Sequence, residues 1–154
     1  MEMPIPHDNS NIVSSWDVLN GQEVTGDCVV IGGGLVGAET AEYLANKGHQ
    51  VTIVEMMDKI AAGESTTVLP LMMKDFADHN VKQLVNTKVD HIENNIVYTA
   101  NEQIKADTII NALGSKKNIF DDSSITIPHV CVGDCSGERT ADIASAIIIA
   151  YKPA

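Results

Sequence analysis

The sequence predicts an α/β fold in which a parallel sheet is flanked by helices and carries a three-stranded antiparallel β-meander. Three observations predict it. Short apolar runs alternate with longer helical patterns, a glycine-rich turn joins the first such pair, and asparagine turns separate three short strand patterns in the middle of the chain. With 154 residues, of which 44% are hydrophobic, the chain can bury the core of one compact domain.

The first strand–helix–strand unit has the clearest pattern. Residues 27–31 (DCVVI) form a near-continuous apolar run bounded by glycine, which predicts a buried parallel strand. A helix is predicted over 35–47, with Gly48 as its C-terminal stop. Residues 50–55 (QVTIVE) predict a second strand.

The middle of the chain changes from this pattern to short strands. A second helix is predicted to start near Thr66 or Thr67, to tolerate Pro70 in its first turn and to end at His79. A short strand is then predicted over 81–85. The three strands of the meander are predicted over 88–93, 96–100 and 103–105.

The last part of the chain returns to the α/β pattern. Residues 107–112 (DTIINA) predict another buried strand, which Leu113-Gly114 closes. One more strand is predicted over 128–133, and a final helix over 140–151.

The first 24 residues are predicted to be a lead-in segment. Pro4 and Pro6 disfavour regular structure there, and Ser14 is placed to cap one short helical turn.

A glycine loop between the first strand and the first helix gives the strongest chemical signal. Its residues are Gly32, Gly33, Gly34, Leu35, Val36 and Gly37. Gly32 permits the tight turn, Gly34 lets the backbone approach a pyrophosphate, and Gly37 lets helix and strand pack closely. This strand–loop–helix context predicts a Rossmann-type domain that binds an adenine dinucleotide through backbone N–H groups and the helix N-terminus.

Glu55 ends the second predicted strand, where the ribose of such a dinucleotide needs an acceptor. Its carboxylate is expected to bind both hydroxyls of the adenosine ribose; the alternative is an ordinary solvated acid. The next three residues offer no cation for a 2′-phosphate, and Lys59 is the nearest one. The predicted cofactor is therefore NAD(H) rather than NADP(H).

Composition argues against several other classes of function. The net charge of −11 disfavours nucleic acid and anionic membranes as partners. The sequence shows no apolar stretch long enough for a membrane span, no signal-peptide pattern, and three cysteines with no secretory context, so we expect a cytoplasmic protein. Cys131 and Cys135 lack a second pair, so no metal site is predicted, and no residue of this chain is predicted to be catalytic.

The sequence resembles a known family over nearly its whole length. The run VVIGGGLVGAETAEYLANKGHQVTIVE is similar to the NAD-binding domain of the pyridine nucleotide–disulfide reductase superfamily. More narrowly, the chain resembles the C-terminal part of NADH:flavin oxidoreductases of the old yellow enzyme class, such as 2,4-dienoyl-CoA reductase, enoate reductase and NADH oxidase. The stretches VSSWDVLNGQEVTGDCVVIGGG, ADTIINALGS and HVCVGDCSGERTADIASAI carry this narrower resemblance.

The resemblance implies roles for three more residues. Glu39 would lie near the nicotinamide, although an acid in the first turn of a helix is also favoured by the helix dipole. Gly114 would let the chain pass close to the dinucleotide, or else serve only a strand-end turn. Asp134 would contact the ribityl chain of FAD, or else be a loop acid.

The resemblance also implies a domain organisation and a reaction. Residues 25–117 would form the NAD(P)-binding domain, and 118–154 the strand and C-terminal helix that return to a flavin domain, most of which this chain lacks. In the intact parent enzyme, NADH would pass a hydride to FAD. We therefore expect a fragment that binds NADH without oxidising it. The alternatives are a free-standing NAD-dependent dehydrogenase and a non-enzymatic nucleotide-binding module. The apolar helix over 140–151 also favours a homodimer.

Overall fold

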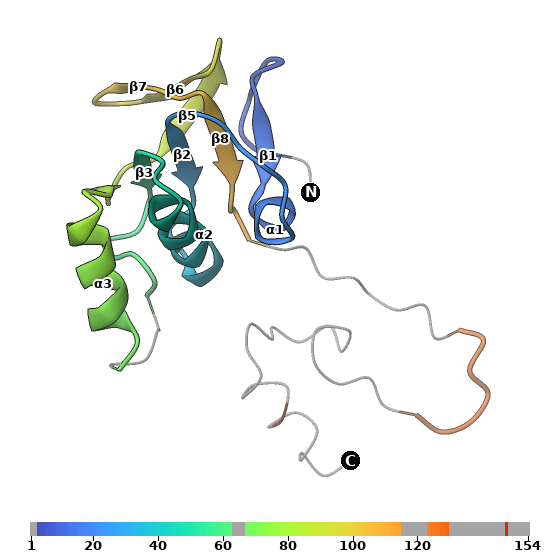
Figure 1. Cartoon of the computed structure of the whole chain (residues 1–154). Helices are drawn as coiled ribbons and strands as arrows, with labels where there is room; N and C mark the ends of the chain where they lie inside the picture. The colour runs from blue at the N-terminus through green and yellow to red at the C-terminus, as the bar shows by residue number, and fades with distance from the viewer. Residues whose placement is uncertain (1–2, 63–66, 115–122, 130–146, 148–154) are drawn as a thin grey trace. The chain divides into compact units, whose positions relative to one another are not determined.

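The computed structural model describes residues 3–62, 67–114, 123–129 and 147. The chain divides into two compact units, one ending at Gly114 and the other beginning at Ser115. All the strands and helices described below belong to the first unit (Figure 1).

A five-stranded parallel sheet forms the centre of this unit. Its strands, in spatial order, are β1 (Ile12–Ser14), β8 (Thr108–Asn111), β2 (Cys28–Ile31), β3 (Val51–Val54) and β4 (Lys82–Leu84). Every neighbouring pair is parallel, so all the carboxyl ends lie at one edge of the sheet. All four residues of β2 and all four of β8 are buried, as expected for strands covered on both faces.

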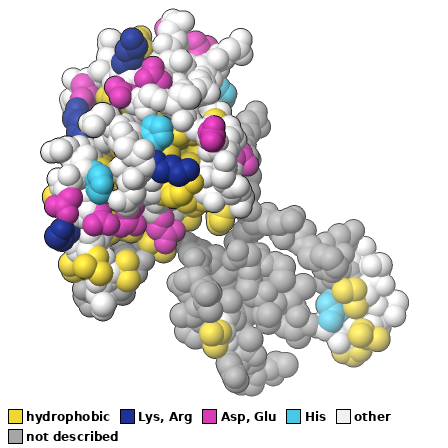
Figure 2. All heavy atoms as spheres, in the orientation of Figure 1, with side chains coloured by type: hydrophobic (Ala, Val, Ile, Leu, Met, Phe, Trp, Pro, Cys, Tyr) yellow, Lys and Arg dark blue, Asp and Glu magenta, His cyan; other side chains and the backbone are white. Residues whose placement is uncertain are grey.

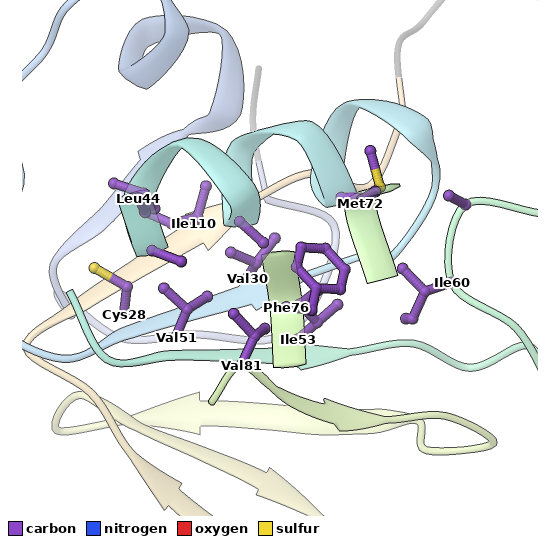
Figure 3. Close-up of a cluster of buried hydrophobic side chains, with 14 of the residues drawn as sticks. Cys28, Val30, Leu44, Val51, Ile53, Ile60, Met72, Phe76, Val81 and Ile110 are labelled. Carbon is purple, nitrogen blue, oxygen red and sulfur yellow. The ribbon is translucent and has the colours of Figure 1, made fainter. Parts of the chain in front are cut away.

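Three helices cover one face of the sheet. They are α1 (Ser15–Leu19), α2 (Leu35–Asn46) and α3 (Leu69–Asp78). Val30 and Ile110 point to this face and pack in one apolar cluster with Leu44 of α2 and Phe76 of α3 (Figure 3). This cluster is the larger of the two cores in the described part of the chain.

The antiparallel meander covers the opposite face. It consists of β5 (Val89–Glu93), β6 (Ile96–Thr99) and β7 (Gln103–Lys105). Because side chains alternate along a strand, Val29 and Ile109 point away from the helices and pack against Ile92 and Val97 of the meander. Asn94 and Asn95 both have positive φ and make the tight turn between β5 and β6.

The predicted α/β fold, with its parallel sheet, flanking helices and meander, is therefore confirmed. One strand was missed: β1 lies within the predicted lead-in and pairs with β8. Its three residues are only half buried and their partners stand nearly a hundred positions away, so no local pattern marks them.

The predicted start of the second helix near Thr66 or Thr67 is wrong. The helix begins at Leu69, after Val68, which makes no side-chain capping bond. Pro70 is accepted in the first turn because that position needs no N–H for an intrahelical bond.

Three expectations fall in parts of the chain that the structure does not describe. The strand over 128–133 lies largely outside the described residues, and so does the helix over 140–151. The domain boundary near residue 117 also lies outside them and stays a prediction.

The described surface carries many acidic side chains. Figure 2 shows them spread over the visible face of the first unit, with fewer basic ones among them. Among the helices that the structure describes, none is long and apolar enough to cross a bilayer.

Candidate functional site

The glycine loop lies at the carboxyl end of β2, in the middle of the sheet. Strands β3 and β4 follow on one side of β2, and β8 lies on the other, so the order of connection reverses at this point. Ligands of open α/β sheets bind in the crevice beyond such a reversal. The turn before α2, the acid after β3 and the backbone after β8 all reach this edge.

Two glycines of the loop are fixed by close backbone contacts. Gly32 has φ +100°, and a Cβ there would lie 2.6 Å from the carbonyl oxygen of Ala112. A Cβ at Gly37 would lie 1.9 Å from the carbonyl oxygen of Gly32. A side chain at either position would push the turn away from β8 or from its own strand, so both positions require glycine.

Gly34 is a glycine for a different reason. Its φ of −63° suits any residue, and a Cβ built on it would meet nothing within 4 Å. The space into which a Cβ of Gly34 would project (the space above Gly34) is thus open in the described part of the molecule. Gly34 is also the N-cap of α2 and offers no side chain to the helix N-terminus.

The N-terminus of α2 faces a position where an anion can be held. Ala38 is the first residue whose N–H bonds back into the helix, to the carbonyl oxygen of Gly34 at 2.9 Å. Leu35, Val36 and Gly37 precede it, and no acceptor for their N–H groups is found among the described residues. Such N–H groups, together with the helix dipole, make a ready site for a phosphate group.

Glu55 follows β3 directly and is buried, with 8% of its surface exposed. Its Oε2 accepts a hydrogen bond from the N–H of Gly33 at 2.6 Å, and its Oε1 accepts one from the N–H of Met57 at 2.7 Å. The alternative that Glu55 is an ordinary solvated acid is therefore wrong. The carboxylate is held in a fixed orientation beside the glycine loop.

Gly33 has a role that the sequence did not predict. Its N–H donates to Glu55 instead of facing the open space above the loop. A Cβ on Gly33 would lie 2.5 Å from Cδ1 of Ile60 and 3.0 Å from Cβ of Glu55. Gly33 is thus the point where the glycine loop packs against the segment that follows β3.

Gly114 lies at the same edge of the sheet, and Glu39 lies on α2, just after its first turn. Glu39 is exposed on α2, and the first turn of this helix holds no acid, so the helix-dipole explanation for Glu39 does not apply. Gly114 is exposed and has φ +77°, shortly after the end of β8. Asp134 lies outside the described residues. Contacts of these three residues with a cofactor stay predictions.

Asn111 was also missed, although it interrupts the buried run TIIN with a polar side chain. It is 7% exposed, and its Oδ1 accepts a hydrogen bond from the N–H of Leu113 at 3.2 Å. This bond orients the backbone that leads from β8 to Gly114. A polar residue in an otherwise apolar strand is the signal that could have revealed it.

Cys28 lies at the amino end of β2, away from this edge. Burial, and after it the nearby charges of Asp27 and Asp107, raise the pKa of the Cys28 thiol to about 11, so this cysteine is a core residue and not a nucleophile. Among the described residues, no group of three His, Cys, Asp or Glu side chains could hold a metal ion.

Several known proteins are similar to this chain. Bilirubin reductase of Mediterraneibacter gnavus is 43% identical over 158 residues, which cover 97% of this chain and 24% of that enzyme. NADH oxidase of Thermoanaerobacter brockii is 54% identical over 57 residues, which cover 35% of this chain and 9% of that enzyme. The chain thus spans about a quarter of the length of bilirubin reductase.

Solved structures show the same likeness. The structure of 2-naphthoyl-CoA reductase in complex with 2-naphthoyl-CoA superposes with a TM-score of 0.78 at 27% identity, covering 98% of this chain and 24% of that one. The family model described as pyridine nucleotide-disulphide oxidoreductase matches residues 3–130, which include the glycine loop, Glu55 and Gly114. The resemblance stated from the sequence is confirmed, and the chain belongs to the pyridine nucleotide-disulphide oxidoreductase family.

Proposed function

We propose that this chain binds NAD(H) at the carboxyl edge of its parallel sheet, as the nucleotide-binding part of a flavin-dependent oxidoreductase. The observation that carries the proposal is the open space above Gly34, the N-cap of α2, which directly follows the residue bonded to Glu55. The family to which the chain belongs supports it.

The pyrophosphate is assigned to the N-terminus of α2. Gly34 lacks the side chain that would fill the approach, and the N–H groups of Leu35 and Val36 are available to phosphate oxygens. No basic side chain is needed for this, which agrees with the acidic net charge of the protein.

The adenosine ribose is assigned to Glu55. Each carboxylate oxygen of Glu55 accepts one backbone N–H and keeps further acceptor capacity for a ribose hydroxyl. A 2′-phosphate at the same place would set a dianion against this carboxylate. The neighbours Met56, Met57 and Asp58 are exposed but carry no positive charge to offset the repulsion.

The nicotinamide would then extend toward β8, where Gly114 leaves room and Glu39 stands on the facing helix. Bound NADH supplies a hydride, which in the intact enzyme would pass to FAD. The residues of this chain contribute binding and orientation, and Asp134 is assigned to the ribityl chain of the flavin. The similar proteins include a bilirubin reductase, an NADH oxidase and a 2-naphthoyl-CoA reductase. The final acceptor that we propose for the parent enzyme is a disulfide, an enoyl thioester or oxygen.

The partners of the chain follow from the same proposal. They are the dinucleotide and the flavin domain of the parent enzyme. The proposed location of the protein is the cytoplasm. Pairing of two copies through the apolar segment 140–151 also stays a proposal, because that segment lies outside the described residues except for Ile147.

Calorimetric titration of the chain with NADH and with NADPH tests the proposal. Two like charges in a partly buried site cost on the order of 1–3 kcal/mol, so NADH should bind roughly tenfold to a hundredfold more tightly. Equal affinities for NADH and NADPH would show that Glu55 does not bind the ribose. Failure of both nucleotides to bind would overturn the proposed function itself.

A further inference from the structure

The segment after β3 folds back onto the glycine loop and contacts it at Gly33. The N–H of Ala61 donates to the carbonyl oxygen of Gly33 at 2.7 Å. On the other side of the same residue, the N–H of Gly33 donates to Glu55. Both polar backbone groups of Gly33 are therefore bonded to this one segment, which begins at Glu55 and reaches Ala61.

Ala61 adopts a conformation that its side chain disfavours. Its φ is +49°, in the left-handed region, and it is 1% exposed. A residue with a Cβ stays in this region only where its surroundings hold it there, and such outliers gather at binding sites. Here the bond to Gly33 and the buried position of Ala61 supply that constraint.

Ile60 packs against the glycine loop at Gly33. It is 6% exposed, and its Cδ1 fills the place that a side chain on Gly33 would need. Ile60 also belongs to the helix-side core, in the same cluster as Met72 and Phe76 of α3 (Figure 3). The contact under Gly33 is thus anchored in the main core of the domain.

The segment is tied down at its start as well. The N–H of Asn86 donates to the carbonyl oxygen of Met57 at 2.8 Å, and the N–H of Thr87 donates to the carbonyl oxygen of Glu55 at 2.9 Å. These bonds join the segment to the residues that follow β4. Its position therefore does not depend on the glycine loop alone.

We infer that Ile60 and Ala61 are positioning residues that hold the glycine loop in its dinucleotide-binding conformation. Ile60 and Ala61 meet the loop at the backbone of Gly33 and hold it there, so that the N–H groups at the start of α2 stay directed at the space above Gly34. This inference rests on the proposed function for the identity of the ligand. It adds that affinity depends on a segment placed beneath the loop.

Two variants that each remove one buried methyl group separate positioning from general stability. Ile60→Val deletes the Cδ1 atom beneath Gly33. Ile92→Val is the matched control, because Ile92 is 2% exposed in the separate core between sheet and meander. We expect similar losses of thermal stability from both. Ile60→Val should weaken NADH binding by about fivefold, and Ile92→Val by less than about twofold, because small misplacements of binding groups are costly. Equal NADH affinities in the two variants would overturn the inference.

Amide hydrogen exchange tests the same inference without any ligand. In Ile60→Val, the amides of Gly33 and Ala61 should exchange at least about tenfold faster than in the unchanged protein, while Ile92→Val leaves them unchanged. Unaltered exchange at both amides in Ile60→Val would contradict the positioning role. If NADH fails to bind the unchanged protein, the proposed function falls, whereas the exchange rates still decide whether Ile60 and Ala61 hold the loop.

Discussion

The N–H of Gly33 donates to Oε2 of Glu55 at 2.6 Å, and this bond joins the loops at the carboxyl ends of two neighbouring strands, β2 and β3. Glu55 thereby orients the glycine loop, and it is also the acceptor proposed for the ribose. A second bond, from the N–H of Met57 to Oε1, fixes the other carboxylate oxygen. Under the proposed function, one buried side chain would thus link the shape of the loop to the choice of nucleotide.

Replacement of Glu55 by glutamine is expected to lower both the stability of the domain and its preference for NADH over NADPH. A glutamine side chain accepts through one oxygen only, so one of the two backbone N–H groups would lose its acceptor. An unsatisfied buried donor costs about 1–3 kcal/mol, and we expect urea denaturation to show a loss of that size in Glu55→Gln. The preference for NADH over NADPH should narrow in the same variant, because the repelling charge is gone.

The matched control for this variant is Glu93→Gln, since Glu93 is an exposed acid on β5. It should change neither the free energy of unfolding by more than about 0.5 kcal/mol nor the nucleotide preference. An unaltered preference in Glu55→Gln would show that the carboxylate does not face the ribose.

Gly37→Ala is expected to destabilise the domain. The added Cβ would lie 1.9 Å from the carbonyl oxygen of Gly32, so the turn and the helix must separate. Such overpacking costs about 1–3 kcal/mol, which thermal or urea denaturation can measure. A variant as stable as the unchanged protein would mean that the strand and the helix are not packed as closely as described.

A pair of acids between α2 and α3 gives a pH-dependent prediction. Burial, and after it a hydrogen bond to Asp75 and the charges of Asp75 and Glu39, raise the pKa of Glu42. A group whose pKa is raised by folding binds its proton more tightly in the folded state. Glu42 therefore favours the folded state when protonated and opposes it when charged at neutral pH.

Glu42→Gln should therefore be more stable than the unchanged protein at pH 7. The difference should shrink as pH falls through the raised pKa of Glu42 toward the ordinary range of a glutamate. Denaturation curves at several pH values measure this, and Asp75→Asn should shift stability in the same direction at pH 7. A Glu42→Gln variant that is less stable at neutral pH would contradict the expected cost of burying a charged Glu42 beside Asp75.

Much of the fold was predictable because local patterns agree with it. The apolar run of β2, the helix that ends before Gly48 and the paired asparagines of the meander each specify their own element. Strand β1 could not be predicted, because its partner β8 lies far along the chain and β1 itself is short and half buried.

Only part of the candidate site could be predicted from the sequence, for the same physical reason. The spacing of Gly32, Gly34 and Gly37 and the acid after β3 can be read in the sequence. The bond from Gly33 to Glu55 and the contact of Ile60 beneath the loop exist only once β2 and β3 are side by side. Such contacts carry no local signal, since an isoleucine or an alanine in a loop is compatible with many environments.

The chain is expected to bind NADH without oxidising it. Its 154 residues contain one glycine loop of this spacing, whereas FAD would need a second loop for its own pyrophosphate. A purified sample should be colourless, and NADH absorbance should not fall in the presence of oxygen or ferricyanide. A yellow sample, or NADH consumption by the purified chain, would instead indicate a self-sufficient enzyme.

Titration of the Gly34→Ala variant with NADH is the most direct measurement of the central proposal. The backbone of Gly34 suits alanine and a Cβ there meets nothing within 4 Å, so the variant should lose less than about 1 kcal/mol of stability. The added methyl group would stand where the pyrophosphate approaches. We predict that NADH binds the unchanged protein and binds Gly34→Ala at least about tenfold more weakly, with both proteins folded. Equal NADH affinity in two equally folded proteins would contradict the proposal that the dinucleotide lies above Gly34.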